Sequence, residues 1–223
     1  MQIEAERSYA VLTGDVIGSS RLGDRARRRL HEALHFAGRN LRARFGEVVP
    51  YPLAVFRGDS WQLLVVPPAR ALRVGLYFRV SLRARMEARE IDTRFAIGIG
   101  AIDFIPGADL SGGDGEAFRR SGQALERLPR GARMGLALPA DIEAQDLRVI
   151  LDLIDIQARR WSDRQALAVA GALLGWTQTQ IAQGLFEPPI SQQAVAQHLS
   201  RAGWRAIWKA IAYFESRLEA LKA

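Results

Sequence analysis

Two aspartates and a short serine-containing segment carry the chemistry that this sequence offers. Asp15 follows an apolar run over residues 9–13 and precedes a glycine and two hydroxyls at 18–20, just before a helical pattern begins. Asp59 lies in a Gly-Asp pair between two other apolar runs. Backbone N–H groups at a helix start bind phosphate oxygens, and carboxylates hold the Mg²⁺ that neutralises those oxygens. Asp15 and Asp59 therefore predict a two-metal phosphate site, with further phosphate contacts from Gly18, Ser19 and Ser20.

The elements around these residues predict a sheet that brings both aspartates to one edge. Apolar extended runs alternate with amphipathic helices over the first 140 residues. We expect strands at 9–13, 48–56, 61–66, 94–100 and 133–138, and helices at 24–45, about 72–80 and 115–128. The order is β-α-β-β-α-β with an α-β extension, which is the ferredoxin-like split βαβ pattern of an α+β fold. Because the first strand of that pattern lies beside the hairpin, Asp15 and Asp59 are expected to converge.

The last third of the chain has a helical pattern throughout. Ser162, Thr177 and Ser191 each precede helical spacing, and the first two have a glutamine three residues later, as in a capping box. Helices are therefore expected to begin near 163, 178 and 192, with a final helix from Gly203. We expect a sheet domain at 1–140, a linker helix at 141–160 and an all-helical helix-turn-helix domain at 161–223.

Residues 177–185 and 191–201 resemble the helix-turn-helix of sigma-like and other bacterial regulators. The apolar positions expected to pack the two helices together are Ile181, Ala182, Leu185, Val195 and Leu199. The outward side chains, whose amides and guanidinium suit contacts in the major groove, are Gln192, Gln193, Gln197, His198 and Arg201. The connection at 186–190 is longer than the usual tight turn, and a helical hairpin that does not bind DNA, such as a dimer module, is the alternative.

The composition indicates a globular protein that binds polyanions. Lys and Arg total 31 against 24 Asp and Glu, a net charge of +7, and the only lysines are Lys209 and Lys222. Arginine binds phosphate bidentately, which favours nucleic acid and nucleotides as partners, although a GC-rich genome would produce the same bias. The absence of cysteine excludes disulfides, iron–sulfur clusters and thiol catalysis. No apolar run is long enough to cross a bilayer, so we expect a cytoplasmic protein with no membrane partner.

Three segments, at 13–20, 57–60 and 95–100, resemble the nucleotidyl cyclase superfamily, which includes class III cyclases and diguanylate cyclases. The whole layout, including residues 114–118 and the helical tail, is also similar to the SatD family. The class III resemblance implies that Asp15 and Asp59 bind Mg²⁺ or Mn²⁺ and that the carbonyl of Val16 contacts the metal. It further implies a purine nucleotide, to which we also assign Arg57, and a homodimer, because those enzymes build their site across two chains.

The chain departs from the class III pattern in its catalytic half. Val55 stands where those enzymes carry a purine-selecting lysine. Arg119 and Gln123 stand where they carry an asparagine and a transition-state arginine. We assign Arg119 or Arg120 as the substitute that stabilises developing phosphoryl charge. The alternative is a surface helix with solvated arginines.

Two further patterns have ordinary as well as functional explanations. His31, Glu32 and His35 spell H-E-x-x-H, the zinc motif of metalloproteases, but Leu41 occupies the third-ligand position, and we interpret the motif as a coincidence. Apolar residues recur at alternating spacings of three and four along 204–221, which predicts either a seam between two protomers or packing within the chain.

The sequence as a whole predicts a DNA-binding transcriptional regulator with a nucleotide-binding, cyclase-like sensor domain. Double-stranded DNA and a nucleotide are the expected partners. The alternative is an active metal-dependent nucleotidyl cyclase or nucleotidyltransferase that releases pyrophosphate.

Overall fold

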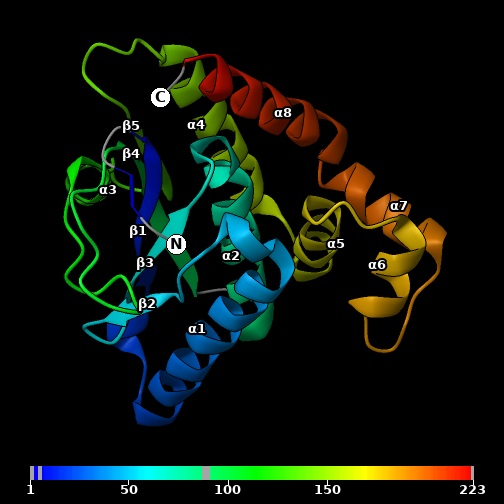
Figure 1. Cartoon of the computed structure of the whole chain (residues 1–223). Coiled ribbons are helices and arrows are strands. Elements are labelled where there is room, and N and C mark those ends of the chain that lie inside the picture. Colours follow the sequence, from blue (N-terminus) through cyan, green and yellow to red (C-terminus); the bar gives the residue numbers. More distant parts are fainter. Residues whose placement is uncertain (1–2, 5–6, 87–90, 222–223) are drawn as a thin grey trace.

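A single five-stranded sheet organises the first part of the chain (Figure 1). The computed structural model describes residues 3–4, 7–86 and 91–221, so the outer ends of the two expected domains, at 1 and 223, lie outside the described residues. The strands are β1 (Tyr9–Ile17), β2 (Ala54–Phe56), β3 (Ser60–Val65), β4 (Asp92–Gly100) and β5 (Met134–Ala137). Their order across the sheet is β2-β3-β1-β4-β5, and only the β4–β5 pair is parallel. The predicted α+β class and the split βαβ order are therefore confirmed.

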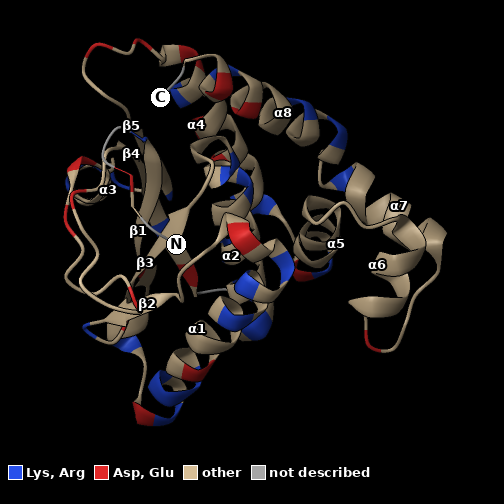
Figure 2. Ribbon diagram, in the orientation of Figure 1, with Lys and Arg blue, Asp and Glu red and all other residues tan. Residues whose placement is uncertain are grey.

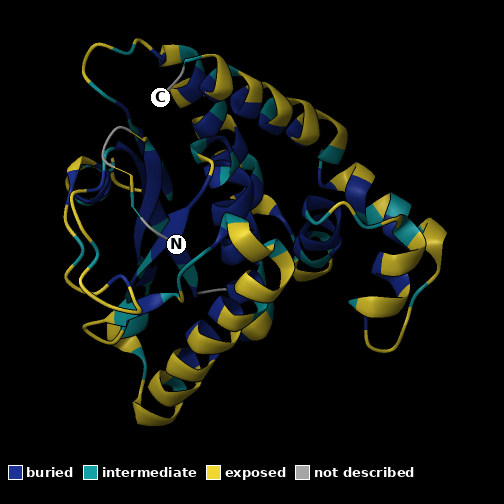
Figure 3. Cartoon of the chain, in the orientation of Figure 1, coloured by how far each residue is buried: buried dark blue, intermediate teal, exposed yellow. Residues whose placement is uncertain are grey.

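Helices cover both faces of this sheet. On one face lie α1 (Asp24–Phe45) and α2 (Ala71–Met86), which pack on alternate strand residues such as Leu12, Leu63 and Ile97. On the other face lie α3 (Glu116–Glu126) and the preceding loop, which pack on Tyr9 and Val11. Successive residues of β1 thus serve two different apolar clusters, as the period of two in a strand requires. Figure 3 shows the resulting buried sheet between helices whose outer sides are exposed.

Close contact between α3 and β4 fixes where α3 lies. A Cβ built on Gly98 would come within 2.3 Å of the Ser121 nitrogen and 2.4 Å of the Ala117 carbonyl oxygen. Only glycine allows the helix backbone to approach the strand this closely. The buried hydroxyls of Thr13 and Ser121 add a hydrogen bond of 2.7 Å between β1 and α3. These contacts hold α3 against the two central strands.

Beyond β5, the described residues contain five helices: α4 (Gln145–Arg160), α5 (Asp163–Leu173), α6 (Gln178–Gly184), α7 (Gln192–Arg201) and α8 (Trp204–Ala220). The three expected starts are confirmed, because Ser162, Thr177 and Ser191 each accept a hydrogen bond from the backbone N–H three residues later. The full capping box forms at Ser162 and at Thr177. Local sequence chemistry therefore determines where these helices begin.

The helical tail packs directly on the sheet domain. One apolar cluster runs from the strands through α2 to residues of α4, α5 and α8. Buried Arg73 of α2 donates to both carboxylate oxygens of Glu215 in α8, at 2.6 and 2.9 Å. Residues 141–160, expected to form a linker helix, contain α4, which packs against β5 and α8.

The apolar repeat of the last helix faces inward. Ile207, Ile211, Phe214 and Leu218 are all buried within the chain. These four residues therefore pack within one protomer and do not form a seam between two protomers. In the described part of the chain, no helix is both long and apolar enough to span a membrane.

Candidate functional site

The two predicted aspartates line the same hollow. Asp15 lies near the end of β1 opposite Ser60 of β3, and the Val16 N–H donates to the Asp59 carbonyl oxygen at 3.2 Å. The hollow has a volume of about 470 Å³ and includes both carboxylates in its lining. The predicted convergence of Asp15 and Asp59 follows from β1 lying beside the hairpin strand β3.

The segment after β1 lines the hollow as expected. Val16, Gly18, Ser19 and Ser20 all contribute to it. Gly18 has φ +81°, a left-handed conformation that suits glycine, and it turns the chain into a short 3-10 helix at Ser19–Arg21. The Ser19 hydroxyl donates to the Asp59 carboxylate. This bond holds the segment against the hairpin and occupies one oxygen of Asp59.

An arginine that the sequence interpretation did not single out binds Asp15. Arg94, near the start of β4, pairs with Asp15 in the antiparallel β1–β4 register. Its Nε and Nη2 donate to the two oxygens of Asp15, both at 2.8 Å. The hydrogen bond to Asp15 is the largest influence on the guanidinium and raises the pKa of Arg94, against the opposing effect of partial burial. Asp15 and Arg94 therefore form a bidentate, charge-assisted pair.

The turn between α3 and β5 supplies two more arginines. Arg130 and Arg133 line the hollow together with Gly131. The turn is held from behind by α4, since the Arg133 N–H donates to buried Asp155 at 2.8 Å and Arg159 donates to the Gly131 carbonyl at 2.9 Å. The Nε of Arg133 is buried and has no hydrogen-bond partner among the described residues. One buried N–H of Arg133 is therefore left without an acceptor among the described protein atoms.

The residues of the hollow fit a divalent cation poorly. Both oxygens of Asp15 are bonded to Arg94, and Asp59 is bonded to Ser19. Among residues 3–4, 7–86 and 91–221, no three His, Cys, Asp or Glu side chains gather closely enough to hold a metal ion. A cation at Asp15 would have to displace a bidentate guanidinium. Binding of Mg²⁺ or Mn²⁺ stays a prediction from the sequence. The hydrogen-bond donors that line the hollow favour an anion over a metal ion.

Three predicted arginines do not line this hollow. Arg57 is exposed in the hairpin turn, with φ +53°, and is absent from the lining of the hollow. Arg119 donates to Asp114 at 2.7 Å. Arg120 donates to the Ile99 carbonyl at 2.8 Å, and Ile99 lies near the opposite end of β4 from Arg94, roughly 16 Å away at the usual strand rise. The structure therefore does not bring Arg119 and Arg120 together with the two aspartates.

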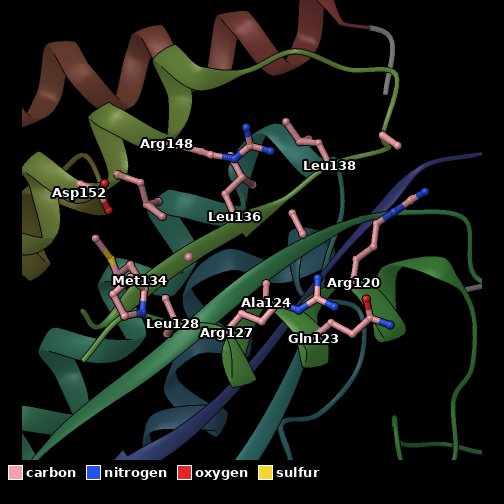
Figure 4. Close-up of a pocket in the computed structure, with 15 residues that line it drawn as sticks. Arg120, Gln123, Ala124, Arg127, Leu128, Met134, Leu136, Leu138, Arg148 and Asp152 are labelled. Carbon is pink, nitrogen blue, oxygen red and sulfur yellow. The ribbon is translucent and has the colours of Figure 1, made fainter. Parts of the chain in front are cut away.

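Arg120 lines a different hollow, which Figure 4 shows between α3, β5 and α4. Its volume is about 610 Å³, and its floor contains Met134, Leu136 and Leu138. Leu128 and Pro129 line both hollows, so the turn that follows α3 separates them. Neither predicted aspartate lines the second hollow.

The H-E-x-x-H residues lie on the exposed side of α1. His31, Glu32 and His35 are exposed, and the two imidazole rings lie 4.5 Å apart between centroids, edge to face. Burial, then the nearby charges of His31 and Arg39, lower the pKa of His35. Leu41, at the position of a third ligand, is fully buried. No third metal-binding side chain joins these residues within the described chain.

The helix pair α6–α7 presents the side chains expected to read DNA. The expected packing residues Ile181, Ala182, Val195 and Leu199 are buried, and Leu185 is half-buried. Along α7, the predicted residues Gln192, Gln193, Gln197 and Arg201 are exposed, as is Ser200. His198 is half-buried and its ring stacks on Phe186, 5.9 Å between centroids, so it belongs to the packed side as much as to the polar face.

Comparison with known proteins gives a distant structural likeness. No protein-family model and no curated protein matches the sequence. A solved structure described as that of the guanylyl cyclase Cya2 is similar to part of the chain, with a TM-score of 0.40 and 15% identity over 56% of this chain and 72% of that one. This likeness is too weak to support an argument about activity. The resemblance to the SatD family stays a prediction.

Proposed function

We propose that this protein is a DNA-binding regulator whose sheet domain binds a phosphorylated ligand, with a purine nucleotide as the expected ligand. The proposal places double-stranded DNA on α7 and the ligand in the hollow between Asp15, Asp59 and Arg94. It includes the expected homodimer, because helix-turn-helix proteins usually read two half-sites.

The observation that carries the DNA-binding part is the exposed face of α7. Gln193 and Gln197 lie one turn apart and Arg201 one turn further, all exposed, on the second helix of a capped and tightly packed pair. Glutamine can bond adenine bidentately and arginine can bond guanine or phosphate. The exposed face of α7 carries amides and a guanidinium and no carboxylate, which suits contacts with base edges and phosphates.

The exposed arginines of α1 support a polyanion partner. Figure 2 shows cations along this helix, and the exposed ones are Arg25, Arg27, Arg28, Arg29, Arg39, Arg42 and Arg44. The guanidinium of Arg44 lies 4.7 Å from the centre of the Trp176 ring, just before α6. The basic helix therefore approaches the start of the helix pair, where it can contribute to attraction of DNA.

A test of the DNA-binding part uses the full chain and a fluorescein-labelled duplex that has been selected from a random-sequence pool by its binding to the wild-type chain. Fluorescence anisotropy should show binding whose affinity falls steeply with salt, by roughly one power per phosphate contact. Gln193→Ala with Gln197→Ala and Arg201→Ala should weaken binding by about 10-fold or more. The matched control is Gln123→Ala with Gln145→Ala and Arg148→Ala, which changes three exposed residues of α3 and α4 that the proposed DNA contact does not use. Equal binding by the triple variant and the control would contradict the proposal.

An active nucleotidyl cyclase is the second candidate function, because Asp15 and Asp59 share one hollow as metal-dependent phosphoryl transfer requires. The distance of Arg119 and Arg120 from that hollow argues against it. Incubation with each nucleoside triphosphate and Mg²⁺ or Mn²⁺ tests it through pyrophosphate release. Turnover that disappears in Asp15→Asn would establish catalysis, and no turnover would leave the ligand-binding proposal in place.

A further inference from the structure

The bond between Arg94 and Asp15 changes what the hollow can bind. A guanidinium has five N–H groups, and Arg94 uses only its Nε and one Nη2 hydrogen on Asp15. The remaining N–H groups of a residue that lines the hollow are available to a ligand. Asp15 thus positions a cation in the hollow and is itself neutralised by it.

The other charged groups of the hollow favour the same kind of ligand. Arg130 and Arg133 line it with Arg94, so three arginines stand against the two carboxylates of Asp15 and Asp59. Arg130 is exposed and has no hydrogen-bond or ion-pair partner among the described residues. The Nη1 of Arg133 bonds the Gly131 and Ala132 carbonyls, and its Nη2 makes no hydrogen bond within the described residues. A guanidinium N–H that has no protein partner can donate to an anionic oxygen.

We propose that the hollow binds the phosphate groups of its ligand through Arg94, Arg130 and Arg133 without a divalent cation. This deepens the proposed function, on which it rests, by assigning to a guanidinium the charge-neutralising role that a metal has in two-metal sites. Asp15 is then a positioning residue for Arg94, whereas in a metal site it would be a ligand. The two possibilities make opposite predictions for the loss of its charge.

The experiment measures binding of inorganic triphosphate to the full chain by isothermal titration calorimetry in a buffer that contains EDTA. The wild-type chain should bind, and added Mg²⁺ should not strengthen binding. Arg94→Ala should weaken binding by about 10- to 100-fold, and Arg130→Ala by a smaller factor. Arg127→Ala is the matched control, because Arg127 lies three residues from Arg130 but lines the other hollow, and its affinity should equal that of the wild type.

Asp15→Asn gives the sharpest contrast. Asparagine keeps one acceptor for Arg94 while the hollow loses a negative group, so triphosphate binding in EDTA should become equal or tighter. In a metal site, the same change should instead abolish the binding that is measured with Mg²⁺. Circular dichroism of each variant establishes that it is folded. If Arg94→Ala does not fold, Arg130→Ala still tests the proposal, because it changes an exposed side chain.

The possible failures are distinguishable. Binding that occurs only with Mg²⁺ or Mn²⁺, or that Asp15→Asn abolishes, would overturn this inference and leave ligand binding by the sheet domain in place. Absence of triphosphate binding both in EDTA and with either cation would overturn both the inference and the ligand-binding part of the proposed function. The anisotropy measurement on α7 variants would remain valid in every case.

Discussion

Replacing Asp155 with alanine should strongly destabilise the protein. Asp155 is 2% exposed and joins three parts of the structure. It accepts from Arg79 of α2 at 2.7 Å and from the Arg133 N–H, beside the hollow, at 2.8 Å. Arg79 is fully buried, and its other partner is Asp92, bonded at 2.6 and 2.9 Å. Burial alone would lower the pKa of Arg79, but the carboxylates of Asp92 and Asp155 together raise it, so the guanidinium stays charged.

The magnitude follows from what Asp155→Ala leaves behind. Removing one partner of a buried ion pair costs about 3–5 kcal/mol, and the lower end applies because Arg79 keeps two bonds to Asp92. Loss of the acceptor for the Arg133 N–H adds roughly 1 kcal/mol. The free energy of unfolding should therefore fall by about 4 kcal/mol, which corresponds to a decrease in Tm of roughly 8–16 °C for a chain of this size.

Urea unfolding followed by circular dichroism measures this change. Asp152→Ala is the matched control, because Asp152 is an exposed aspartate one turn earlier in α4, and it should change the free energy by no more than about 0.5 kcal/mol. Asp155→Asn keeps an acceptor and should fall between the two. A loss below about 1 kcal/mol in Asp155→Ala would show that Asp92 alone satisfies Arg79 and would refute the reasoning.

Two further predictions concern packing and pH. Gly98→Ala should destabilise the protein by about 1–3 kcal/mol, because the added methyl group would lie within 2.4 Å of the α3 backbone. Gly58→Ser in the exposed hairpin turn is the comparison, because its new side chain meets no neighbour and only the φ of +86° strains it. Equal Tm values for Gly98→Ala and wild type would contradict the close α3–β4 contact. Burial, followed by nearby cations, lowers the pKa of both His35 and His198 below the usual 6.5. As pH falls, these two histidines are therefore protonated in the unfolded chain before they are protonated in the folded one. The free energy of unfolding should decrease as pH falls through about 6.5 toward the folded-state pKa values. NMR titration of the two imidazoles checks this, and a pKa above 6.5 for either ring would contradict its assigned surroundings.

Much of the fold was predictable from local patterns. The order of strands and helices follows from apolar periodicity, and the starts of α5, α6 and α7 follow from capping residues such as Ser162. The convergence of Asp15 and Asp59 also followed, because the split βαβ order places the first strand beside the hairpin. These features depend on neighbours in sequence or on a common topology.

The partners of the site residues were not predictable in the same way. Arg94 meets Asp15 only through the antiparallel β1–β4 register, which puts the start of one strand beside the end of the other. That register, combined with an arginine on the same side of the sheet as Asp15, is the signal that could have identified it. Arg120 was expected at the site, but α3 runs back along β4 and places it near Ile99. The sequence pattern of α8 likewise does not say whether Phe214 packs within the chain or against another protomer.

A phosphate site held by arginine in the hollow between β1, β3 and β4 can be observed directly in a crystal structure of the protein with a nonhydrolysable nucleoside triphosphate, grown with Mg²⁺ present. We predict phosphate oxygens within hydrogen-bond distance of Arg94 and Arg133, with the bond from Arg94 to Asp15 intact. A cation coordinated by Asp15 with Arg94 displaced, or a nucleotide bound elsewhere on the chain, would contradict it.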